Sequence, residues 1–146
     1  VALRMRQHCA NAENVVNFLK KHKEVTKVIY STEHDKPIAE RAKKYLTGGN
    51  GPMVGIELKG GIEAGKRFIE SLKMFYHVAN IGDARSLAIH PASTTHSQLN
   101  EKELAASGVT QSYVRLCIGL EHIDDIIDDL DQALNKSSKG NLKAVS

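Results

Sequence analysis

The sequence predicts an α+β fold, a two-layer arrangement in which a small, mainly antiparallel sheet of four strands carries helices on one face. Short runs of β-branched or alternating apolar residues occur at four places in the chain, and stretches with apolar residues at helical spacing separate them. Breakers rich in glycine and proline mark several of the boundaries. The 146 residues, 41% of them apolar, are enough for one domain with its own core.

The individual elements follow from these patterns in chain order. Strands are expected over 25–30, 53–59, 77–81 and 113–120, the last with the clearest alternation. Helices are expected over 3–21, 37–46, 62–76 and 122–134. Asn100 and Glu103 resemble a capping box for a further short helix that ends at Gly108. The stretch 82–99 is expected to be a long loop.

Composition excludes several classes of function. The net charge of +3 is small and only 5% of residues are aromatic, so neither a nucleic-acid partner nor a base-stacking surface is expected. No apolar run is long enough to span a membrane. Cys9 and Cys117 lie in apolar periodic stretches without metal or redox spacing, which favours reduced core cysteines and a cytoplasmic protein. His90 and His96 match no zinc spacing, so no metal is expected.

The last expected strand places an arginine on one face of the sheet. Because side chains alternate along a strand, Val114 and Leu116 belong to the helix-facing side, and Arg115 points the other way beside Cys117. A guanidinium between small neighbours can bind a carboxylate or phosphate with two parallel hydrogen bonds. The alternative is an ordinary arginine on a solvated sheet face.

Two further sets of polar residues could carry a function, one in a loop and one on the last helix. The loop 80–97 is rich in hydroxyls and provides several hydrogen-bond donors, either for a ligand or for its own backbone. The last helix carries acids that are interpreted as a solvated face, because they occupy the positions left over by its apolar stripe. The hydroxyl residues are Ser93, Thr94, Thr95 and Ser97, and the acids are Glu121, Asp124, Asp125, Asp128, Asp129 and Asp131.

Three motifs together resemble the Cys/Met-metabolism family of pyridoxal-phosphate (PLP) enzymes. They are ANIGDARSL at 79–87, HPASTTHS at 90–97 and VRLCIGLE at 114–121. The opening helix, the segment 60–66 and the acid-rich last helix fit the same family, so the resemblance covers about residues 1–135. Ala79-Asn80 and the Ser-Thr-Thr-His run are similar to the sulfhydrylase branch of this family.

The resemblance implies a fold-type-I PLP enzyme whose C-terminal small domain, residues 1–135 here, closes over the substrate, with 136–146 as a polar tail. It implies that Arg115 binds the substrate α-carboxylate and that Asn80 adds a second contact, often through its backbone. Thr95 and Ser93 would support Arg115. The implied reaction is γ-replacement, in which O-acetyl-L-homoserine and sulfide or a thiol give homocysteine or methionine.

The chain opens at Val1, and helical periodicity begins almost at once without a clear N-cap. We therefore expect a boundary within or just before a helix of a longer protein, or else proteolytic processing. The lysine that anchors PLP is expected upstream of Val1, so this piece alone is expected to be inactive. The full-length protein is expected to be a homo-tetramer.

Two alternative functions stay open at this point. The first is a methionine or cystathionine γ-lyase, or a cystathionine γ-synthase, of the same family. The second is a free-standing regulatory module that binds amino acids without PLP.

Overall fold

The computed structural model describes residues 1–138 and shows a five-stranded mixed sheet with the strand order β1-β2-β5-β4-β3. The first four strands in this order pair antiparallel, and β3 pairs parallel with β4 at the edge. The strands are β1 Val25–Ile29, β2 Met53–Leu58, β3 Tyr76–His77, β4 Leu87–Ile89 and β5 Tyr113–Cys117. The helices are α1 Ala2–Leu19, α2 Lys36–Tyr45, α3 Gly61–Ser71, α4 Glu101–Ala106 and α5 Ile123–Ser137, with a short 3₁₀ helix over Pro91–Ser93.

The α+β class is confirmed, and three of the four strand pairings are antiparallel, but the predicted number of four strands is wrong because the sheet has five. The missed strand is β4, which lies inside the stretch expected to be a loop. Its three residues are all buried, so they show no alternation, and hydroxyl-rich sequence surrounds them. The strand expected over 77–81 is reduced to Tyr76 and His77, which pair with Leu87 and Ala88.

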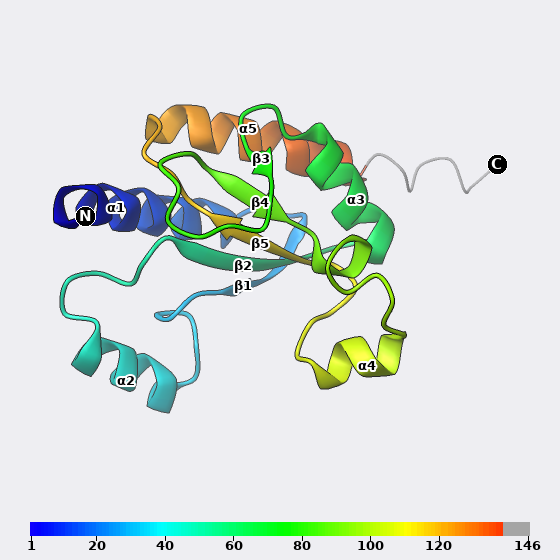
Figure 1. The fold of residues 1–146 in the computed structure, drawn as a ribbon, viewed down its shortest axis with the longest axis horizontal. Helices are drawn as coiled ribbons and strands as arrows, with labels where there is room; N and C mark the ends of the chain where they lie inside the picture. The colour runs from blue at the N-terminus through cyan, green and yellow to red at the C-terminus, as the bar shows by residue number, and fades with distance from the viewer. Residues whose placement is uncertain (139–146) are drawn as a thin grey trace.

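Three helices cover one face of the sheet and enclose the core. Figure 1 shows α1, α3 and α5 on one side of the strands, while α2 and α4 lie on the other side. The strand residues on the helix side, including Val54, Ile56, Val114 and Leu116, are fully buried. They meet the buried residues Ala12, Val15, Leu19, Phe68, Ile126, Leu130 and Leu134 of the three helices. By contrast, α2 buries none of its residues.

Helix α3 ends at Ser71, earlier than its apolar pattern predicts. Leu72 adopts extended backbone instead. Asp129 of α5 explains the end, because its carboxylate accepts the backbone N–H groups of Lys73 at 2.9 Å and Met74 at 2.8 Å. Phe75 still packs into the core, although the backbone that carries it is not helical.

The capping box before α4 is confirmed. Asn100 Oδ1 accepts the backbone N–H of Glu103 at 3.0 Å, and Glu103 Oε2 accepts that of Asn100 at 2.9 Å. Gly108 follows the helix with φ of +76°, a conformation that glycine adopts without steric cost. Such local polar signals locate this short helix although it lacks a clear apolar stripe.

The two ends of the chain were expected to lack an N-cap and to form a polar tail. Val1 precedes α1 and makes no side-chain cap hydrogen bond, as its apolar side chain requires. Helix α5 continues through Ser137, and residues 139–146 of the predicted tail lie outside the described part of the chain.

Cys9 and Cys117 are buried and unpaired. Within residues 1–138, no helix combines the length and apolar character needed to cross a membrane.

Candidate functional site

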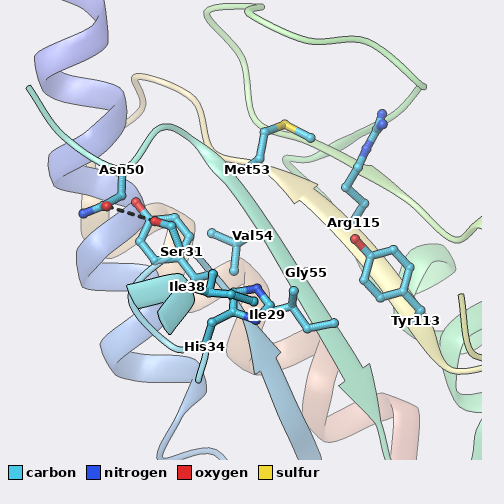
Figure 2. A pocket seen from close by; sticks show the side chains of 11 residues that line it. Ile29, Ser31, His34, Ile38, Asn50, Met53, Val54, Gly55, Tyr113 and Arg115 are labelled. Carbon is cyan, nitrogen blue, oxygen red and sulfur yellow. Dashed lines mark hydrogen bonds between the residues drawn. The ribbon is translucent and has the colours of Figure 1, made fainter. Parts of the chain in front are cut away.

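Arg115 lies in β5 between β2 and β4, with Gly55 and Ile89 as its partners in register. Its neighbours along the strand, Val114 and Leu116, are fully buried on the helix side. The alternation of the strand therefore sends the guanidinium to the face that the core helices do not cover. Figure 2 shows Arg115 extending away from β5 on this face.

A pocket of about 380 Å³ opens beside Arg115 on the same face. Gly55 shapes its floor, because a Cβ at this position would lie 2.7 Å from Cε2 of Tyr113. The ring of Tyr113 occupies the space that a larger residue would take. The pocket is lined by Ile29, Tyr30, Ser31, His34, Ile38, Asn50, Met53, Val54, Gly55, Tyr113 and Arg115 (Figure 2).

The guanidinium of Arg115 has no hydrogen bond or ion pair with any side chain or backbone group that the structure describes, and no carboxylate lines the pocket. Burial raises the pKa of the neighbouring Tyr113, and the positive charge of Arg115 opposes that rise. A half-buried guanidinium without an acidic partner is suited to an anionic ligand. The expected placement of Arg115 is thus confirmed, whereas its ligand stays a prediction.

His90 organises the loop that follows β4. Its ring is fully buried. The Nε2–H group donates to the carbonyl oxygen of Gln111 at 2.7 Å, which leaves Nδ1 to accept from the hydroxyl of Ser93 at 2.8 Å. Burial lowers the pKa of His90 and so favours the neutral ring. Gly65 of α3 lies against the ring, and a Cβ there would be 2.6 Å from His90 Cδ2.

The hydroxyls of this loop are satisfied largely within the loop itself. Thr94 donates to the carbonyl oxygen of His90 at 2.9 Å, and Ser93 contacts the ring of the same residue. Thr95 is exposed, and its hydroxyl lies 2.8 Å from Nδ1 of His96. Neither Ser93 nor Thr95 hydrogen-bonds to Arg115 in the described part of the chain. The geometry favours local satisfaction for Ser93 and Thr94, and the supporting roles of Ser93 and Thr95 stay predictions.

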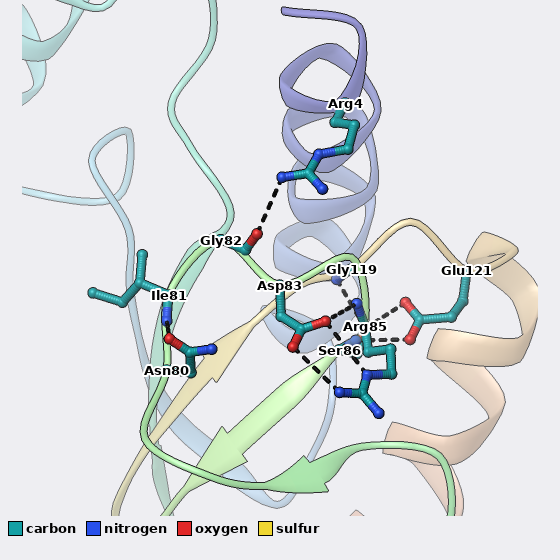
Figure 3. Close-up of polar contacts among 9 residues, drawn as sticks. All are labelled: Arg4, Asn80, Ile81, Gly82, Asp83, Arg85, Ser86, Gly119 and Glu121. Atoms are coloured by element: carbon teal, nitrogen blue, oxygen red, sulfur yellow. Dashed lines mark hydrogen bonds and ion pairs between the residues drawn. The ribbon is translucent and has the colours of Figure 1, made fainter. Parts of the chain in front are cut away.

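Asn80 begins the other polar loop and is exposed. Its side-chain oxygen accepts the backbone N–H of Ile81 at 2.8 Å (Figure 3). The side-chain amide nitrogen and the backbone groups of Asn80 take no part in this hydrogen bond. Further along, Asp83 binds the backbone and the guanidinium of Arg85, and these hydrogen bonds lower the pKa of its carboxyl. Arg85 also lies 4.3 Å from the centre of the Tyr76 ring. These contacts stabilise part of the loop from within, and Arg4 of α1 adds a hydrogen bond to the carbonyl oxygen of Gly82.

The prediction of a fully solvated acidic face on α5 is wrong at two positions. Asp129 is only 7% exposed and binds the backbone after α3, as described above. Glu121, just before α5, binds the backbone and hydroxyl of Ser86. Asp124, Asp125 and Asp128 are exposed as expected. Helical spacing reports only which face of a helix is apolar, so no signal in the pattern identifies acids that reach distant backbone amides.

Metal ligation was not expected at His90 and His96, and both imidazoles have other partners. His90 uses both ring nitrogens in hydrogen bonds, and His96 contacts Thr95. Among the side chains that the structure describes, no three His, Cys, Asp or Glu are grouped so that they could hold a metal ion.

Comparison with known proteins gives consistent matches over almost the whole chain. The profile of the Cys/Met metabolism PLP-dependent enzyme family matches residues 1–135. The O-acetyl-L-homoserine sulfhydrylase of Leptospira meyeri is 51% identical over 133 residues, which make up 90% of this chain and 30% of that protein. The L-methionine gamma-lyase of Fusobacterium nucleatum subsp. polymorphum is 45% identical over 134 residues, or 92% of this chain and 34% of that protein.

A solved structure extends the likeness to three dimensions. A Campylobacter jejuni protein assigned as an O-acetylhomoserine (thiol)-lyase superposes with a TM-score of 0.83 at 42% identity. The match covers 92% of this chain and 32% of the other, which carries N′-pyridoxyl-lysine-5′-monophosphate. The chain spans about a third of the length of the curated relatives it matches.

Proposed function

Because the chain belongs to the Cys/Met metabolism family of PLP-dependent enzymes, we propose that it is the substrate-binding domain of an O-acetyl-L-homoserine sulfhydrylase. The whole protein would replace the acetate of O-acetyl-L-homoserine with sulfide or a thiol, giving homocysteine or methionine. The proposal is supported by the names of relatives that are 46–51% identical to this chain.

The observation that carries the proposal is the unpaired guanidinium of Arg115 beside a pocket without acids. An amino acid brings a carboxylate that can accept two parallel hydrogen bonds from this fork. Fixing that carboxylate restricts rotation of the substrate and holds its Cα–H bond in the orientation that the reaction needs. Asn80 would supply a second contact from its loop, and Ser93 and Thr95 would limit the movement of the loop after β4.

PLP supplies an electron sink for carbanion chemistry when it is bound. The lysines in the described part of the chain are exposed or half-buried, and none lines the pocket beside Arg115. These residues therefore fit the acid group of a substrate but do not fit the covalent anchor of the cofactor. The role we assign to this chain is positional, and the cofactor would be held mainly by other parts of the longer protein.

Replacement of Arg115 tests the carboxylate site in the full-length enzyme. We expect Arg115→Ala to weaken capture of O-acetyl-L-homoserine by roughly 2–5 kcal/mol, measured as a fall in kcat/KM. Arg41→Ala is the matched control, because Arg41 is an exposed arginine of α2 that lies outside the pocket. A near-normal kcat/KM for Arg115→Ala would remove this residue from the site.

Product analysis of the same enzyme separates replacement from elimination. Elimination is the second candidate, because the chain is 45% identical to a methionine γ-lyase. With O-acetyl-L-homoserine and sulfide, replacement releases acetate and homocysteine. Release of ammonia and an α-keto acid as the main products would favour the γ-lyase instead.

A further inference from the structure

The carboxylate of Glu121 holds Ser86 by two atoms at once. Glu121 Oε1 accepts the backbone N–H of Ser86 at 2.7 Å, and Oε2 accepts its hydroxyl proton at 2.9 Å. The same hydroxyl oxygen accepts the backbone N–H of Gly119 at 2.9 Å. Figure 3 shows the three residues converging between the loop and the start of α5. We refer to Ser86, Gly119 and Glu121 as the Ser86 clamp.

The clamp is closely packed. Ser86 is fully buried, so its polar groups depend on these partners. Gly119 allows the close approach, because a Cβ there would overlap both Glu121 Oε2 and the backbone nitrogen of Ser86. On the other side, the 2% exposed Asn11 of α1 donates to the carbonyl oxygens of Gly119 and Glu121, each at 3.0 Å. The segment that carries Glu121 is thereby fixed to α1.

The clamp joins the two parts of the chain that carry the proposed substrate contacts. Gly119 follows the strand of Arg115, and Ser86 ends the loop that begins at Asn80. A further bond beside the clamp, from Leu120 N–H to the carbonyl oxygen of Ala84 at 2.8 Å, ties the same two segments together. The antiparallel pairing of β4 with β5 begins next to the clamp, with Leu87 opposite Cys117 and Ile89 opposite Arg115.

From this geometry we propose that Glu121 and Ser86 are positioning residues that fix the Asn80 loop relative to Arg115. The inference rests on the proposed carboxylate site and assigns a role to an acid that does not line the pocket beside Arg115. Removing the carboxylate frees the Ser86 N–H and hydroxyl, and the loop can then shift against β5. A shift between two contacts of one substrate weakens capture of the substrate, and it also disturbs the orientation that the carboxylate contact gives to the Cα–H bond.

The test uses Glu121→Ala and Glu121→Gln in the full-length enzyme loaded with PLP, with O-acetyl-L-homoserine as the varied substrate. We expect Glu121→Ala to raise KM by about tenfold and to lower kcat by about threefold, because both the capture and the orientation of the substrate are disturbed. Glu121→Gln keeps an acceptor for the Ser86 N–H and is expected to raise KM by about threefold. If Glu121→Ala fails to accumulate as folded enzyme, Glu121→Gln carries the test.

Asp128→Asn is the matched control, because it removes an exposed acid of α5 outside the clamp, and its KM is expected to be normal. A purely structural role for Glu121 would lower the thermal midpoint and the fraction of active enzyme without changing KM. A normal KM in both Glu121 variants would therefore overturn the inference.

A double-mutant cycle with Arg115→Ala separates this inference from the proposed function. If Glu121 acts through the carboxylate site, its replacement adds little to KM once Arg115 is gone. Fully additive effects would show that Glu121 acts elsewhere and would contradict the inference. If Arg115→Ala raises KM but the Glu121 variants do not, only the clamp's role fails. If Arg115→Ala leaves KM unchanged, the proposed function fails and the inference fails with it.

Discussion

The two faces of β5 differ in what their side chains contact. On the helix side, Val114 and Leu116 are fully buried against α1, α3 and α5. On the other side, Tyr113 and Arg115 are partly exposed, and the guanidinium has no partner among the described residues. A strand of five residues thus separates apolar contacts that stabilise the fold from a charge that the fold leaves available. The difference predicts that replacing a residue on the helix side lowers stability more than replacing a residue on the open face.

The largest expected loss of stability is on the helix side of β5. Leu116→Ala should lower the free energy of unfolding by about 2–5 kcal/mol, because it leaves a cavity among packed helices. Met53→Ala, on the pocket face opposite Cys117, is half-exposed and should lose less. Denaturant unfolding of both variants makes the measurement, and equal losses would remove the proposed difference between the faces.

A second test examines how tightly α3 packs on the segment after β4. Gly65→Ala places a Cβ against the ring of His90, which cannot move away because both of its nitrogens are hydrogen-bonded. We expect a loss of about 1–3 kcal/mol, despite the higher helix propensity of alanine. Gly48→Ala is the control, since a Cβ there meets no atom within 4 Å. Similar thermal midpoints for the two variants would show that the contact is loose.

The smallest expected effect is a pH dependence from His90. Burial lowers its pKa in the folded state, so below about pH 6.5 the unfolded chain binds a proton that the folded chain does not. Stability should fall as the pH drops below that value and stay level above it, as far as His90 contributes. Unfolding free energies between about pH 5 and pH 8 would measure this. His90→Gln should be less stable than the natural chain and should lose this contribution, and an unchanged pH dependence would contradict the assignment.

The sequence predicts the parts of this fold that repeat over several residues or rely on local hydrogen bonds. The alternation in β5 placed Arg115 on the open face, and the capping box located α4. It does not predict β4, because three buried residues have no measurable period. It also misses the contacts of Glu121 and Asp129, whose partners lie 35 and 55 residues away. These partners are mostly backbone N–H groups, which almost every residue carries. Long-range contacts to backbone amides leave no pattern in residue types.

The central claim is that the guanidinium of Arg115 pairs with the acid group of an amino-acid substrate, and a comparison of two ligands tests it most directly. The full-length enzyme and its Arg115→Ala variant would be titrated with an unreactive amino-acid analogue and with the matching amide, which lacks the negative charge. We predict that the natural enzyme prefers the acid by at least about tenfold and that the variant loses this preference. The same preference for the acid in both proteins would contradict the account.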